Sequence, residues 1–149
     1  MAAQRRAEVT WQGDLMSGSG RIDSVGSGAF GPLGLTWASR SEEVTGGKTS
    51  PEELIAAAHA ACFSMALSNG LAQAGHAPEE LRVSAESTFV PGTGITKMAL
   101  SVEGRVPGLD AEGFRQAAEA AKENCPVSAA LKGNVEITLE ATLAAGSAS

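Results

Sequence analysis

The sequence predicts an α+β fold in a single domain covering residues 1–149. The length of 149 residues suits one domain with a sizeable core. Several stretches alternate apolar and polar residues with the period of a β-strand. Two helical patterns lie among these strands without a regular strand–helix–strand repeat, which favours α+β over a doubly wound α/β sheet.

The N-terminal third is predicted to form strands and turns. Residues 7–11 alternate small or apolar with polar side chains, as in a strand. Seven glycines and one proline in residues 13–34 predict a turn-rich hairpin rather than a helix. Residues 35–41, LTWASRS, are predicted to form a further strand.

A long central helix is predicted from Pro51 to about Gln73. Ser50 suits the N-cap, Glu53 completes a capping box with it, and Gly75 ends the helix. Residues 54–67 are small or apolar nearly all round, so we expect burial on most sides of the helix. A sheet would cover one side, and a second helix or a partner subunit the other.

The second half is predicted to hold two strands, a helix and a last strand, over residues 81–90, 95–106, 110–124 and 134–143. The helix must end near Asn124-Cys125-Pro126, because proline disfavours helical geometry in the residue before it. Residues 128–132 are expected to add one more turn. The tail from about residue 144 is expected to be disordered.

Composition bears on partners and location. The net charge is −6 and no cluster of lysine and arginine appears, which argues against nucleic acid and against an anionic membrane surface. No apolar segment follows the two N-terminal arginines, so no signal peptide is predicted and a cytoplasmic setting is the default. The apolar run of residues 54–67 is too short to span a bilayer. The two cysteines are therefore expected to be reduced thiols.

Two glycine-containing motifs resemble nucleotide-binding signatures but lack the required context. Gly26-Ser-Gly-Ala-Phe-Gly31 is followed by proline and glycine rather than by a helix. Gly47-Lys48-Thr49 would end a phosphate-binding loop that begins at Glu42, where a carboxylate would repel phosphate.

Four residues are candidates for chemistry: Arg40, Glu52, Cys62 and Cys125. Each also has a structural interpretation. Most buried cysteines are inert, a carboxylate at a helix start favours the helix dipole, and an arginine often lies at a strand edge. His59, one turn before Cys62, is interpreted as a core histidine.

A family resemblance favours the chemical interpretation. The stretch SPEELIAAAHAACFSMAL from Ser50 resembles the central helix of the OsmC branch of the OsmC/Ohr family, and NCPVS from Asn124 resembles its second cysteine motif. WQGD from Trp11 and GITK from Gly94 extend the similarity, which covers residues 7–143. The resemblance implies antiparallel sheets around two central helices, an intertwined homodimer, and a thiol peroxidase acting on organic hydroperoxides and hydrogen peroxide. It also implies that Cys62 is the peroxidatic thiol and Cys125 the resolving thiol.

The residue chemistry fits these roles. Cys62 lies about three turns inside its helix, beyond the reach of the helix dipole, and apolar surroundings raise a thiol pKa. A cation must offset this effect, and an arginine held by a carboxylate suits the task. Glu52 lies ten residues before Cys62, about 15 Å along the helix and on another face. We therefore expect the partner subunit to supply Glu52 and its arginine.

The arginine has two candidates. In the OsmC branch it lies on the strand before the central helix, where Arg40 falls. In the Ohr branch it lies in the N-terminal glycine-rich segment, where the matching position is near Ser17 and the nearest arginine is Arg21. Arg40 is the first choice.

The expected cycle uses no metal and no organic cofactor. Peroxide oxidises Cys62 to a sulfenic acid, Cys125 forms a disulfide with it, and an external dithiol, by resemblance a lipoyl-type one, reduces the bond. The implied role is defence against oxidative and osmotic stress. Three alternatives remain: a thiol redox sensor, a non-enzymatic module binding hydrophobic ligands, and a zinc protein using His59, His76 and the cysteines.

Overall fold

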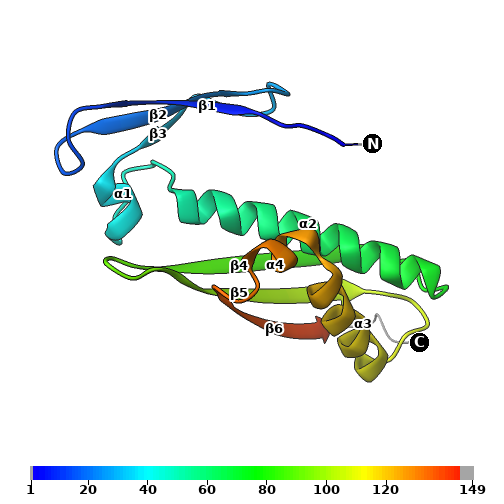
Figure 1. The fold of residues 1–149 in the computed structure, drawn as a ribbon. Coiled ribbons are helices and arrows are strands. Elements are labelled where there is room, and N and C mark those ends of the chain that lie inside the picture. The colour runs from blue at the N-terminus through cyan, green and yellow to red at the C-terminus, as the bar shows by residue number, and fades with distance from the viewer. Residues whose placement is uncertain (1, 145–149) are drawn as a thin grey trace. The chain divides into compact units, whose positions relative to one another are not determined.

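The computed structural model of the chain describes residues 2–144, and the predicted tail beyond Ala144 lies outside them. The elements in chain order are β1 (Ala7–Gln12), β2 (Ser19–Val25), β3 (Leu33–Leu35), α1 (Trp37–Ser41), α2 (Pro51–Gln73), β4 (Glu80–Val90), β5 (Gly94–Arg105), α3 (Ala111–Asn124), α4 (Pro126–Leu131) and β6 (Glu136–Leu143) (Figure 1). They form two compact units that divide between Leu54 and Ile55. That these units make one domain stays a prediction.

The N-terminal unit is built on the antiparallel sheet β1–β2–β3. The predicted strand over residues 7–11 and the predicted hairpin region are confirmed. The glycine motif at residues 26–31 forms the connection between β2 and β3, and no helix follows it.

The predicted strand over residues 35–41 is wrong, because most of this segment is the short helix α1. A reciprocal capping box starts α1: the Ser39 N–H donates to Thr36 Oγ1, and the Thr36 N–H donates to Ser39 Oγ, both at 3.0 Å. The Ser39 hydroxyl also reaches the Thr49 carbonyl at 2.9 Å. These bonds outweigh the strand propensity of the sequence and turn Arg40 onto a helix.

The C-terminal unit is built on the sheet β4–β5–β6 (Figure 1). The strands β4 and β5 form the predicted hairpin and are antiparallel. The expectation of purely antiparallel sheets is wrong for β6, which runs parallel to β5. The reason is the connection, since α3 and α4 return the chain to the starting end of β5 as a helical crossover.

The core of this unit lies between one face of the sheet and the helices. β5 alternates buried and outward residues, and its buried Met98, Leu100 and Val102 belong to one apolar cluster with residues of α2 and α3. Phe63 on α2 and Phe114 on α3 are fully buried in this cluster. Burial of such side chains contributes roughly 1.5–3 kcal/mol each to folding.

Both predicted ends of α2 are confirmed. Ser50 Oγ accepts the Glu53 N–H at 3.1 Å, although the Glu53 carboxylate accepts from the Thr49 hydroxyl at 2.8 Å instead of completing the box. The His76 N–H donates to the Leu71 carbonyl at 2.8 Å where Gly75 takes a φ of +86°.

In the single chain α2 is buried along one face, and the expected cover of its other side stays a prediction. His59, Phe63, Leu67 and Leu71 are buried along one face, whereas Met65 is 72% exposed. By length and composition alone the helix could cross a membrane, since its 23 residues include an 18-residue window of mean hydropathy 1.4, of which 28% is buried. A core helix passes the same test, and the packing of Phe63 and Leu67 in the core cluster is that of a core helix.

Two glycines give a matched test of this packing. A Cβ added at Gly104 on β5 would lie 2.5 Å from the buried Phe114 ring, whereas nothing lies within 4 Å of one added at Gly70 on α2. We expect Gly104→Ala to lower the free energy of unfolding by about 1–3 kcal/mol through overpacking. Gly70→Ala should raise it by up to about 1 kcal/mol, because alanine favours the helix. Urea denaturation measures both, and a stable Gly104→Ala protein would contradict the packing.

Candidate active site

The structure brings the two cysteines of the chain together in the C-terminal unit. Cys62 lies midway along α2, and Cys125 lies at the break where α3 ends and α4 begins. Pro126 starts α4 directly after Cys125, as the sequence predicts. Both cysteines are free thiols, and their side chains are within hydrogen-bonding reach of each other.

The two thiols differ in how their surroundings shift the pKa. Burial raises the pKa of Cys62, and the nearby Cys125 adds to the rise although the Val127 N–H opposes it. Burial also acts to raise the pKa of Cys125, but hydrogen bonds from the Ser128 N–H, the Cys62 thiol and the Ser128 hydroxyl outweigh it, so the pKa of Cys125 is lowered. The Cys125 side chain makes no capping hydrogen bond to α4. The Ser128 N–H therefore acts on this thiol as a nearby donor and not as part of a helix cap. The first proton is therefore lost from Cys125.

The two thiols also differ in access. The Cys125 residue has no exposed surface, whereas Cys62 is partly exposed. A molecule arriving from solvent therefore meets Cys62 first.

His59 and Ser128 form a second buried contact next to the thiols. His59 Nε2 lies 2.8 Å from Ser128 Oγ, and the residues are 0% and 4% exposed. Burial lowers the pKa of His59, so its ring is neutral at pH 7. The full burial of His59 confirms its interpretation as a core histidine. Its Nδ1, however, has no hydrogen-bond partner among residues 2–144.

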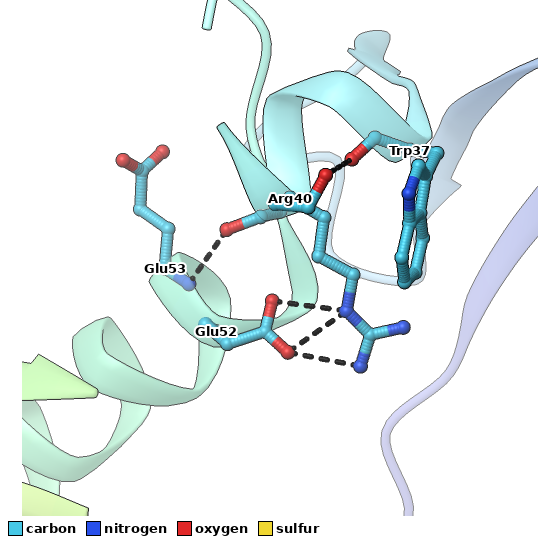
Figure 2. Close-up of polar contacts among 6 residues, drawn as sticks. Trp37, Arg40, Glu52 and Glu53 are labelled. Carbon is cyan, nitrogen blue, oxygen red and sulfur yellow. Dashed lines mark hydrogen bonds and ion pairs between the residues drawn. The ribbon is translucent and has the colours of Figure 1, made fainter. Parts of the chain in front are cut away.

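Arg40 and Glu52 are paired in the N-terminal unit. Arg40 Nη2 and Nε each lie 2.9 Å from Glu52 Oε1, and Nε also lies 3.2 Å from Oε2. Figure 2 shows the guanidinium facing the carboxylate, with the indole ring of Trp37 beside the Arg40 side chain. The Glu52 side chain is 8% exposed and that of Arg40 32%. A buried carboxylate of this kind is retained because the arginine compensates its charge.

The alternative arginine lies in a different setting. Arg21 lies on β2, its side chain is 61% exposed, and its Nε is 2.5 Å from Asp23 Oδ1. This geometry is that of a surface ion pair. Of the two candidates, only Arg40 is held by the carboxylate that the sequence singled out.

Ser128 was missed by sequence reasoning, because its position has meaning only once Cys125 is known to cap α4. It is the N3 residue of the helix that Cys125 caps, a position whose side chain faces the cap. The spacing of His59 and Cys62 on α2 then brings the histidine to Ser128 and the thiol to Cys125. Within residues 2–144, the structure contains no cluster of three or more His, Cys, Asp or Glu side chains placed to bind a metal ion.

The lowered pKa of His59 predicts a pH-dependent stability. An unfolded chain protonates this ring around the ordinary value of 6.5, and the folded chain only at lower pH. The free energy of unfolding should therefore fall as the pH drops from 6.5 towards the folded pKa, because the unfolded state binds more protons there. Urea denaturation across this pH range should show that the free energy of unfolding depends less steeply on pH in His59→Gln than in the wild type.

Ser64→Ala is the matched control for this measurement. It removes a hydroxyl from the same helix, where Ser64 Oγ bonds the Ala60 carbonyl at 2.7 Å, and it removes no titrating group. Ser64→Ala should keep the wild-type dependence of the free energy of unfolding on pH. An equally steep dependence on pH in the wild type and in His59→Gln would contradict the neutral buried ring.

Comparison with known proteins places this geometry in a family. The family model described as OsmC-like protein matches residues 44–140. The Peroxiredoxin OsmC of Escherichia coli K12 is 42% identical over 143 residues, which are 94% of this chain and 96% of that protein. The organic hydroperoxide resistance protein of Xanthomonas axonopodis pv. citri is 34% identical over 63% of this chain and 67% of its own length.

A solved structure agrees in fold. The organic hydroperoxide resistance protein OhrB of Bacillus subtilis superposes with a TM-score of 0.67 at 28% identity, over 91% of this chain and 97% of that one. The family resemblance noted in the sequence is thereby confirmed, and so is its α+β fold. The chain belongs to the OsmC family.

Proposed function

We propose that this protein is a thiol-dependent peroxidase that reduces organic hydroperoxides and hydrogen peroxide through Cys62 and Cys125. The observation that carries the proposal is the contact between a reachable thiol and a buried thiol of lowered pKa. The proposal agrees with the relatives named Peroxiredoxin OsmC and organic hydroperoxide resistance protein.

The cycle has three steps. The Cys62 thiolate attacks the terminal peroxide oxygen, the O–O bond breaks, and the alkoxide or hydroxide leaves as alcohol or water after taking a proton. The Cys125 thiolate then attacks the sulfur of the Cys62 sulfenic acid, and hydroxide leaves as water. An external dithiol, such as a lipoyl-type dithiol, supplies two electrons by exchange and restores both thiols.

The first step needs a cation, and within the described residues no lysine or arginine is among the groups that shift the pKa of either cysteine. The pKa of Cys62 is raised and that of Cys125 lowered, so Cys62 is the harder of the two thiols to ionise. Peroxide cleavage requires the opposite arrangement, with the charge on Cys62. A guanidinium beside Cys62 would favour its thiolate and stabilise the departing oxygen. We assign this role to Arg40, with Glu52 holding it.

The partner subunit of a homodimer is the source that fits best. Glu52 and Cys62 lie ten residues apart on the same helix, so about 15 Å of helix rise separates them. The face of α2 that carries the exposed Ala57, Ala58, Ala61 and Met65 is apolar and uncovered in the single chain. A second copy that buries this face would bring its own α2 beside this one. The two helices would then be the two central helices of the expected intertwined dimer. It would also place α2 in a protein interior rather than in a membrane, in keeping with a cytoplasmic enzyme.

The thiol cycle is tested by adding one equivalent of cumene hydroperoxide to reduced protein in a stopped-flow instrument and then counting thiols. We expect rapid loss of two thiols per chain and an intramolecular Cys62–Cys125 disulfide. Cys62→Ser should abolish the reaction, and Cys125→Ser should stop at a sulfenic acid that a dimedone reagent traps.

Steady turnover with peroxide and a dithiol separates the enzyme from its alternatives. A redox sensor would oxidise once without sustained turnover, and a binding module would keep both thiols. Retention of both thiols in the wild type would rule out the peroxidase.

The shared site is tested with mixed dimers purified through two different affinity tags. One subunit carries Glu52→Gln and the other Cys62→Ser, and each variant alone should be nearly inactive. If Glu52 acts across the interface, the mixed dimer regains one complete site and about half of the wild-type activity per dimer.

The matched control reverses the expected outcome. A wild-type subunit is paired with one carrying both Glu52→Gln and Cys62→Ser. A shared site leaves this dimer without any complete site, whereas a site within one chain leaves it half active. An inactive first dimer together with a half-active second dimer would overturn the shared site.

A further inference from the structure

The contact between His59 and Ser128 has no part in the cycle above, and it ends at the sulfur of Cys125. All three residues belong to the C-terminal unit. His59 Nε2 and Ser128 Oγ are 2.8 Å apart, with no exposed surface on the histidine. The Ser128 hydroxyl in turn lies close enough to the Cys125 thiol to lower its pKa, and Ser128 is the third residue of the helix that Cys125 caps. These contacts form a continuous buried chain from α2 through α4 to the second thiol.

The unpartnered Nδ1 of His59 fixes the direction of this chain. A neutral imidazole carries one N–H and one bare nitrogen. If the proton were on Nδ1, a buried N–H would have no acceptor within the described residues. Buried N–H groups without a partner are rarer than under-satisfied acceptors, so the proton belongs on Nε2. Nε2–H then donates to Ser128 Oγ.

This direction determines what the serine does. Its oxygen accepts from His59, so its own O–H is directed towards the sulfur of Cys125. An O–H donor stabilises a thiolate more than a neutral thiol, because hydrogen bonds to charged groups are the stronger ones. The reverse direction would turn the Ser128 proton towards the histidine and leave the sulfur without this donor.

We propose that His59 is a positioning residue for the resolving thiol: through its Nε2–H it holds the Ser128 hydroxyl on Cys125, and so keeps Cys125 ready to attack the Cys62 sulfenic acid. This inference rests on the proposed function for the resolving step. In that step the Cys125 thiolate gives its electron pair to the Cys62 sulfur, the S–O bond breaks, and hydroxide leaves and becomes water. The Ser128 proton stays on its oxygen throughout.

Two measurements test the chain of contacts. The first titrates Cys125 by the ultraviolet absorbance of its thiolate in a Cys62→Ser background, which requires no peroxidase activity. Ser128→Ala and His59→Leu should each raise the pKa of Cys125 by about one unit, the effect of losing one hydrogen bond to a charged group. His59→Gln should restore most of the shift, since its amide can donate to Ser128. Ser64→Ala on the same helix should leave the titration unchanged.

The second measurement separates the two chemical steps by trapping sulfenic acid and counting thiols over time. Ser128→Ala and His59→Leu should slow disulfide closure by roughly threefold to tenfold, because loss of thiolate is partly offset by the greater nucleophilicity of a more basic thiol. The rate of sulfenic acid formation should not fall, because removing a donor from Cys125 leaves Cys62 no harder to ionise. The double variant should be no slower than either single variant, since both act through one hydroxyl.

Three outcomes would overturn the proposal. One is an unchanged Cys125 pKa in both single variants, and another is a shift with His59→Leu but not with Ser128→Ala. The third is a nitrogen–proton NMR spectrum of histidine-labelled protein that places the His59 proton on Nδ1. Failure of the wild type to form any disulfide would instead refute the peroxidase cycle, while the titration would still decide the role of His59.

Discussion

The contact between the Cys62 and Cys125 thiols is the interaction on which the proposed chemistry of this protein depends. Two thiols in contact titrate as a coupled pair, and their surroundings decide which of them loses its proton first. Here the pKa of Cys62 is raised and that of Cys125 lowered, so the buried thiol is the easier of the two to ionise. This order disfavours the Cys62 thiolate that the proposed peroxide step needs, unless a cation lies beside it.

The packing of the C-terminal unit holds the two cysteines in contact. Phe63, next to Cys62 on α2, is fully buried in the apolar cluster, which fixes the rotation of the helix. On the other side, Asn124 ends α3 and Pro126 begins α4, so the chain turns at Cys125. The turn cannot be replaced by a continuous helix, because proline at this position prevents it. Core packing thus fixes the position of the Cys62 sulfur, and the helix break fixes that of the Cys125 sulfur.

Much of this arrangement was predictable from the sequence, because it depends on local signals. The start of α2 at Ser50-Pro51 and the break at Pro126 follow from capping and proline rules, and they place both cysteines correctly. The pairing of Arg40 with Glu52 also agrees with the expected roles of these residues. Their joint use with Cys62 remains a prediction, because it depends on a second chain.

Other features were not predictable, because they depend on bonds between segments distant in the sequence. Residues 35–41 contain the apolar residues of a strand, yet the Thr36–Ser39 capping box and the bond from Ser39 to the Thr49 carbonyl make them a helix. The parallel pairing of β6 with β5 follows from the crossover through α3 and α4 rather than from the alternation of β6 itself. Ser128 has no distinctive sequence signal until Cys125 is known to cap its helix.

The pairing of Arg40 with Glu52 has a consequence for how a thiolate would be stabilised. Together they are formally neutral, so their field falls off faster with distance than that of a free arginine. Such a pair favours a thiolate only where the guanidinium lies nearer the sulfur than the carboxylate does. Because Glu52 is buried and makes several bonds to Arg40, the guanidinium is held in one orientation relative to the carboxylate. In the proposed site the carboxylate would weaken the field of the cation and fix its direction, as a preorganised site requires.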